Sequence, residues 1–109
     1  MDKSIITIKQ AHSIENVISK SRFIAYIKPV STENEAKAFI DEIKTKHKDA
    51  THNCSAYTVG PEMNIQKAND DGEPSGTAGI PMLEILKKQE IHNVCVVVTR
   101  YFGGIKLGA

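Results

Sequence analysis

The chain has 109 residues, 40% of them hydrophobic and 25% charged, which is enough for one small globular domain with one core. Its formal net charge of +1 excludes the broad basic excess of a general nucleic-acid-binding protein, so an RNA contact would need a local patch, and no DNA specificity is evident. No apolar run approaches the ~20 residues that span a bilayer, and the N-terminal residues lack a signal-peptide core, so we expect a cytoplasmic protein without membrane contact.

The first part of the chain predicts two strands and a helix. Weak alternation indicates a strand at residues 5–9, and stronger alternation indicates another at 22–28, which ends at Pro29. Thr32 and Glu35 then form a capping-box pattern. One helical stripe follows, made of Ala36, Phe39, Ile40 and Ile43. This helix should end near His47 and Lys48, where cations suit the C-terminus.

The second part predicts a hairpin, a helix and a buried strand. Residues 52–59 alternate as a strand, Gly60 and Pro61 form a turn, and residues 63–68 return as the partner strand. A helix should begin near Thr77 with Ser75 or Thr77 as its cap, since Pro81 is tolerated in a first turn. Residues 94–98 are continuously apolar, which indicates a central strand covered on both sides.

This order of elements predicts an α+β fold, in which a mixed, mainly antiparallel sheet packs against helices in a single domain. The chain's two cysteines, Cys54 and Cys95, lie inside strand-like runs with no CxxC pattern. We therefore expect both thiols to be reduced and buried, with no disulfide or zinc site.

The first of two glycine-rich segments is DDGEPSGTAGIP at residues 70–81. Asp70, Asp71 and Glu73 are close enough in sequence to share a cation such as Mg²⁺, but a solvated turn around Gly72 explains them more simply. The following SGTAG residues can bind an anion at a helix N-terminus or simply cap that helix, and both interpretations stay open.

The second segment is TRYFGGIKLG at residues 99–108. Arg100 and Lys106 can each meet a phosphate, while Tyr101 and Phe102 can stack on a base or a partner's side chain. Adjacent strand residues point to opposite faces, so one of the two aromatic residues should face the core. A salt bridge from Arg100 to Asp70, Asp71 or Glu73 is an equally good structural alternative.

Two other groups of residues have simple structural explanations. His52 and Cys54 would share a strand face, but no third residue is placed to orient a base, so catalysis by this pair is a minor hypothesis. The basic cluster at the end of the first helix, Lys44, Lys46, His47 and Lys48, is a solvated helix end, with RNA contact as a minority alternative.

Four segments resemble the YigZ/Impact family over nearly the whole chain: SRFIAYIKPV, HNCSAYT, NDDGEPSGTAGIPML and VVVTRYFGGIKLGA. The RYFGG-x-K-x-G element is the most specific of them. The resemblance implies a β-α-β domain like the second domain of a small-subunit ribosomal protein. It also implies an N-terminal Impact-type domain that ends before its last helix and before a ferredoxin-like domain, which would leave part of the 94–98 strand uncovered. Impact-type proteins of eukaryotes are translational regulators in the nutrient-sensing, general-control pathway.

Two functional hypotheses follow. The first, which the resemblance implies, is a non-catalytic module that binds a translation-associated protein, the ribosome or RNA through the two glycine-rich segments. The second is a small metal- or phosphate-dependent hydrolase that uses the acidic residues of the first segment with His52. We favour the first, with no cofactor, no metal and no catalytic residue. Its expected binding residues are Asp71, Glu73, Ser75, Gly76, Thr77, Gly79, Arg100, Tyr101, Gly103, Gly104 and Lys106.

Overall fold

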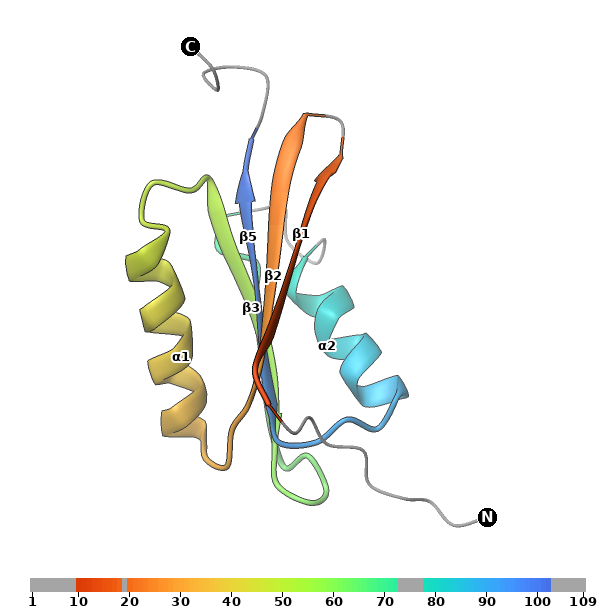
Figure 1. The fold of residues 1–109 in the computed structure, drawn as a ribbon. Helices are drawn as coiled ribbons and strands as arrows, with labels where there is room; N and C mark the ends of the chain where they lie inside the picture. Colours follow the sequence, from red (N-terminus) through yellow and green to blue (C-terminus); the bar gives the residue numbers. More distant parts are fainter. Residues whose placement is uncertain (1–9, 19, 73–77, 103–109) are drawn as a thin grey trace.

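The computed structural model describes residues 10–18, 20–72 and 78–102. Its elements are, in chain order, β1 (His12–Ile18), β2 (Ser21–Pro29), α1 (Glu33–Lys46), β3 (His52–Val59), β4 (Ile65–Asn69), α2 (Gly79–Lys88) and β5 (Val94–Tyr101). The sheet lies in the middle, with α1 against one face and α2 against the other (Figure 1). The predicted α+β class is confirmed.

The strand order in the sheet is β1-β2-β5-β3-β4, and every neighbouring pair of these strands is antiparallel. The described strands therefore contain no parallel pair, although the sequence left room for a mixed sheet. β5 is the central strand, as predicted, since it lies in the middle of the strand order. Helix α1 packs on one of its faces, and its side chains at Val94, Cys95 and Val97 have no exposed area. Val96 and Val98 are half-buried.

Two apolar clusters hold the three layers together. On the α1 side, Phe39 and Ile43 pack against alternate residues of β3 and β5, including Tyr57 and Val97. On the α2 side, Leu83 and Leu86 pack against the residues in between, including Ala56 and Val94. Because successive side chains of a strand point to opposite faces, each of these strands contributes apolar residues to both clusters. Both cysteines are buried, as expected, and burial raises the pKa of the Cys95 thiol to about 12.

Helix α1 forms where the sequence predicted it. The hydroxyl of Thr32, the N-cap, accepts a hydrogen bond from the Glu35 amide at 3.1 Å, and the Glu35 carboxylate accepts one from the Ser31 amide at 2.7 Å. These bonds use amide groups that have no partner inside the helix. The helix ends at Lys46, and His47 follows as the C-cap.

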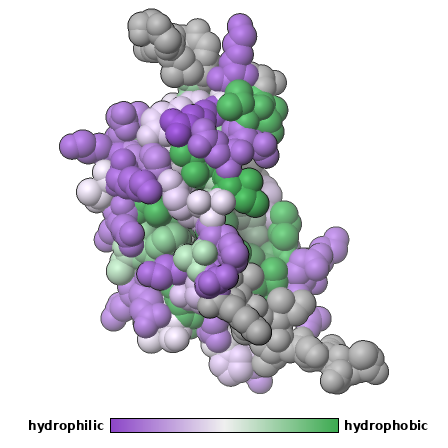
Figure 2. All heavy atoms as spheres, viewed as in Figure 1, coloured by the Kyte–Doolittle hydropathy of each residue, from purple (hydrophilic) through white to green (hydrophobic). Residues whose placement is uncertain are grey.

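Strand β1 was not predicted. It reads HSIENVI, and all of its residues are exposed because it pairs only with β2 among the described strands and lies at the sheet edge. Ile14 and Val17 are each 67% exposed. Apolar surface is visible over the β1–β2 hairpin in Figure 2. The strand predicted at residues 5–9 lies outside the described residues. No helix in the described ranges is long and apolar enough to cross a membrane.

Candidate functional site

The two segments singled out in the sequence meet at one end of the sheet. His52, the first residue of β3, pairs with Arg100 near the end of β5, and its ring also contacts the turn that follows β4. The His52 Nδ1 atom lies 2.7 Å from the Asp71 carbonyl oxygen, which can only accept, so Nδ1 carries the proton. A Cβ atom at Gly72 would lie 3.2 Å from the same ring. We call this region the loop end of the sheet, defined by residues 51–53, 70–72 and 100–102.

Asp71 is held by protein groups in the turn. One carboxylate oxygen accepts a hydrogen bond from the Asn53 amide at 2.7 Å, and the other lies 3.9 Å from the Lys44 ammonium of α1. The residue has a positive φ of 47°, and Gly72 has one of 92°. The Asp71 side chain therefore fastens the turn to β3 and α1, and its predicted role in ligand binding stays a prediction.

Asp70 caps helix α2. Its Oδ1 atom accepts hydrogen bonds from the Ala78 amide at 3.1 Å and the Gly79 amide at 2.6 Å. The helix begins at Gly79, two residues later than the sequence indicated, and this cap comes from the far end of the loop. Gly79 allows the helix to approach β4 closely, because a Cβ atom there would lie 2.6 Å from the Asn69 amide nitrogen.

The two adjacent carboxylates thus serve different elements, Asp70 the start of α2 and Asp71 the start of β3. Within the described ranges, no group of three or more His, Cys, Asp or Glu residues is arranged to hold a metal ion.

Arg100 lies on the α2 side of the sheet between aromatic neighbours. Its guanidinium carbon is 5.8 Å from the centroid of the Phe23 ring and 5.4 Å from that of the Phe102 ring. Both distances lie within the range of cation–π attraction. Phe102 is 52% exposed and is positioned by a hydrogen bond from its amide to the Thr51 hydroxyl at 2.9 Å. The aromatic residues that accompany Arg100 are therefore Phe23 and Phe102, of which the sequence indicated only Phe102.

Tyr101 points to the other face, towards α1. Its hydroxyl lies 2.7 Å from His47 Nδ1 and 3.3 Å from a carboxylate oxygen of Asp49, and the Tyr26 hydroxyl lies 2.6 Å from His47 Nε2. The inward-facing aromatic residue that alternation predicted is thus Tyr101. Tyr101 and Arg100 therefore lie on opposite faces of the sheet, and the predicted role of Tyr101 in ligand binding stays a prediction.

An uncharged His47 satisfies every bond of this network when its Nδ1 atom carries the proton. Tyr101 donates to Asp49 and accepts from Nδ1–H, while Tyr26 donates to Nε2. Burial lowers the pKa of His47 below its ordinary value of 6.5, with the neighbouring Lys46 and Arg22 charges acting in the same direction. The sequence indicated only a cation at a helix end and missed this network.

Stability should therefore fall on mild acidification. Because the pKa of His47 is lower in the folded than in the unfolded state, the unfolded state binds more protons, and the free energy of unfolding falls as the pH decreases from about 7.5 to about 5.5. Urea unfolding at several pH values in this window should show a smaller decrease in the free energy of unfolding for His47→Gln than for the unchanged protein. Equal slopes for the two proteins would contradict the assignment.

His52 and Cys54 share a face of β3, as alternation predicted, but they contact different carbonyl groups. The Cys54 thiol donates to the Asp70 carbonyl at 3.2 Å, whereas His52 bonds to that of Asp71. These bonds give both side chains structural roles. The remaining predicted binding residues lie outside the described residues, and their roles stay predictions: Glu73, Ser75, Gly76, Thr77, Gly103, Gly104 and Lys106.

Fold and site together define a small α+β domain whose loop end presents an arginine between aromatic rings beside a capped helix N-terminus. The sequence profile of the Impact N-terminal domain matches residues 19–109. The chain belongs to the Impact family.

Its relatives include bacterial and eukaryotic proteins. The chain is 64% identical over 106 residues to IMPACT family member YvyE of Bacillus subtilis, covering 97% of this chain and 49% of that protein. It is 43% identical over 93 residues to IMPACT family member YigZ of Escherichia coli, covering 84% of this chain and 46% of that protein. The solved structure of the two-domain translational regulator Yih1 superimposes with a TM-score of 0.58 at 32% identity, covering 84% of this chain and 36% of Yih1. The chain thus spans about half the length of these bacterial relatives.

Proposed function

We propose that this chain is a non-catalytic binding module that contributes to translation regulation by contacting a translation-associated protein, the ribosome or RNA. Family membership supports this proposal, because Yih1, which shares the fold, is described as a translational regulator. The hydrolase alternative has no support in the described site, since His52, Cys54, Asp70 and Asp71 make bonds within the domain.

The observation that carries the proposal is the Arg100 group at the loop end. A guanidinium can bind a carboxylate or phosphate through two parallel hydrogen bonds, and aromatic rings beside it can stack on a base or a side chain. Phe102 is 52% exposed, and Phe23 and Arg100 are half-buried, so the group combines a surface-accessible ring with a cation fixed on a central strand. Acidic groups of a partner would be recognised here.

Co-sedimentation of the full-length protein with ribosomes at low and moderate salt tests this proposal. We expect Arg100→Ala to lower the affinity about tenfold, because an arginine at the centre of a binding surface often carries that much binding energy. The matched control is Arg22→Ala, since Arg22 pairs in register with Tyr101 on the α1 side and bonds to Glu15 there. No binding above background by the unchanged protein, or equal loss in both variants, would contradict the proposed site.

A further inference from the structure

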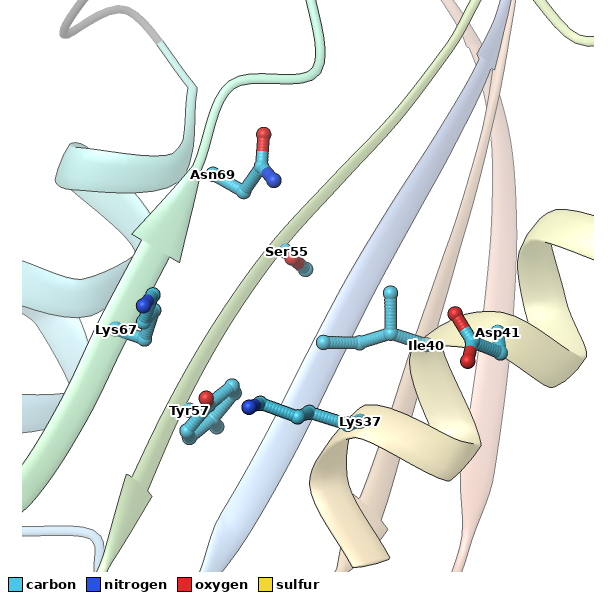
Figure 3. Close-up of a pocket in the computed structure, with 7 residues that line it drawn as sticks. All are labelled: Lys37, Ile40, Asp41, Ser55, Tyr57, Lys67 and Asn69. Atoms are coloured by element: carbon cyan, nitrogen blue, oxygen red, sulfur yellow. The ribbon is translucent and has the colours of Figure 1, made fainter. Parts of the chain in front are cut away.

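A groove lies between α1 and the edge strand β4, on the face of the sheet opposite to Arg100. Helix α1 packs mainly on β5 and β3, so it leaves the outer strand β4 less covered. The groove has a volume of about 230 Å³. Figure 3 shows the residues that line it: Lys37, Ile40, Asp41, Ser55, Tyr57, Lys67 and Asn69. We call it the α1–β4 groove.

Positively charged side chains stand on both sides of this groove. Lys37 comes from α1 and Lys67 from β4, and neither has an ion-pair partner within the described ranges. Asp41 also lines the groove, but it lies beyond Ile40 from Lys67 in Figure 3. A negatively charged group placed between the two ammonium groups would therefore gain two favourable contacts.

The edge of β4 is suited to accept another strand. β4 is last in the strand order, so one side of its backbone has no strand beside it among the described elements. The opposite face of β4 packs against α2, which holds the edge in place. β1, the other edge strand, is exposed along its whole length and carries no lysine. An extended peptide pairing with β4 would place alternate side chains on the groove side, next to Lys67.

The groove favours a peptide over a single-stranded nucleic acid. Nucleic-acid strands are usually held by exposed aromatic faces that stack on the bases. Among the described residues, Tyr57 is the only aromatic residue that lines the groove; it is 2% exposed, and its hydroxyl donates to the Glu33 carboxylate. An acidic peptide strand, in contrast, would bind through its backbone to the β4 edge and through its carboxylates to the two lysines.

We propose that the β4 edge and the α1–β4 groove bind an extended acidic peptide segment of a partner protein as an additional antiparallel or parallel strand. Its backbone pairs with β4, and its acidic side chains on the groove side lie between Lys37 and Lys67. The groove lies on the α1 face of the sheet, whereas Arg100 lies on the α2 side.

The experiment uses the isotope-labelled full-length protein and a capped eight-residue peptide of alternating threonine and glutamate. We expect saturable shifts of the amide resonances of residues 65–69. The Lys37→Glu, Lys67→Glu double variant should bind about fivefold more weakly, because each reversed charge replaces an attraction by a repulsion. Lys88→Glu on α2 should bind the peptide as the unchanged protein does. Single Lys37→Gln and Lys67→Gln variants replace the double variant if its unfolding midpoint falls.

Four results with the peptides would overturn the proposal. They are the absence of saturable shifts, an equal loss of affinity with Lys88→Glu, shifts confined to residues 12–18, and equally tight binding of the corresponding threonine–lysine peptide. An eight-nucleotide oligouridylate that binds the same amides more tightly than the peptide would assign the groove to nucleic acid, which also overturns it. This assay follows the amides of residues 65–69 and varies Lys37 and Lys67, whereas the ribosome assay varies Arg100, so failure here and failure of ribosome binding are distinguishable.

Discussion

Replacing Gly79 by alanine is expected to destabilise the domain by about 3 kcal/mol, the upper end of the cost of forcing extra atoms into a packed site. The added Cβ would lie 2.6 Å from the amide nitrogen of Asn69 and 2.8 Å from its carbonyl atoms. These are backbone atoms of β4, so no side-chain rotation relieves the contact. Either α2 or the end of β4 has to move. Urea unfolding followed by circular dichroism measures the loss.

Local propensity gives the opposite expectation for Gly79, because alanine is a better helix former than glycine by about 1 kcal/mol. The control is Gly60→Ala, where φ is +100° but the nearest atom, in the Asn64 side chain, is 3.5 Å from the added Cβ. There we expect a loss of only about 1 kcal/mol, from backbone strain alone. A Gly79→Ala protein as stable as the unchanged one would contradict the close approach.

Replacing Asp70 by alanine should cost about 2 kcal/mol, at the upper end of the range for the loss of a helix cap. The lost carboxylate oxygen accepts from two amides at the start of α2, at 3.1 and 2.6 Å, and a charged acceptor strengthens such bonds. A negative charge at this position also suits the helix dipole. Hydrogen exchange at the Ala78 and Gly79 amides should accelerate by more than the change in global stability explains.

Asp41→Ala is the matched control for Asp70→Ala. Asp41 is an exposed carboxylate on α1 and has no ion pair or hydrogen bond within the described part of the chain. Its removal should leave the free energy of unfolding nearly unchanged. If both variants lose the same stability, the effect of Asp70 comes from net charge and not from the cap.

These two residues also connect stability to the candidate site. Asp70 and Gly79 fix the start of α2 against the end of β4, and the turn at Asp71 and Gly72 lies between β4 and that helix. The same turn contacts His52, which pairs with Arg100. We therefore expect weaker ribosome binding for Gly79→Ala as an indirect effect, so the Arg100→Ala variant is the cleaner test of the surface.

The sequence by itself determined the elements whose signals are local. The capping residues Thr32 and Glu35 and the apolar stripe after them specify α1, because a cap and a helical face involve residues within a few positions of one another. Alternation specifies β3, and the continuous apolar run specifies β5 as a central strand. The sequence also placed Arg100 inside the glycine-rich segment that follows the predicted 94–98 strand.

The tertiary structure decided what depends on contacts between distant residues. The exposed strand β1 gave no alternating apolar pattern, because a sheet edge with no helix over it needs none. The cap of α2 comes from Asp70, eight and nine positions before the amides it accepts from, and no nearest-neighbour pattern encodes that bond. Alternation separates Arg100 from Tyr101, but only the pairing of β2 with β5 places Phe23 beside the first, and only the packing of α1 places His47 beside the second. A strand has two faces by its own geometry, and the partners of each face are set by how the whole chain folds.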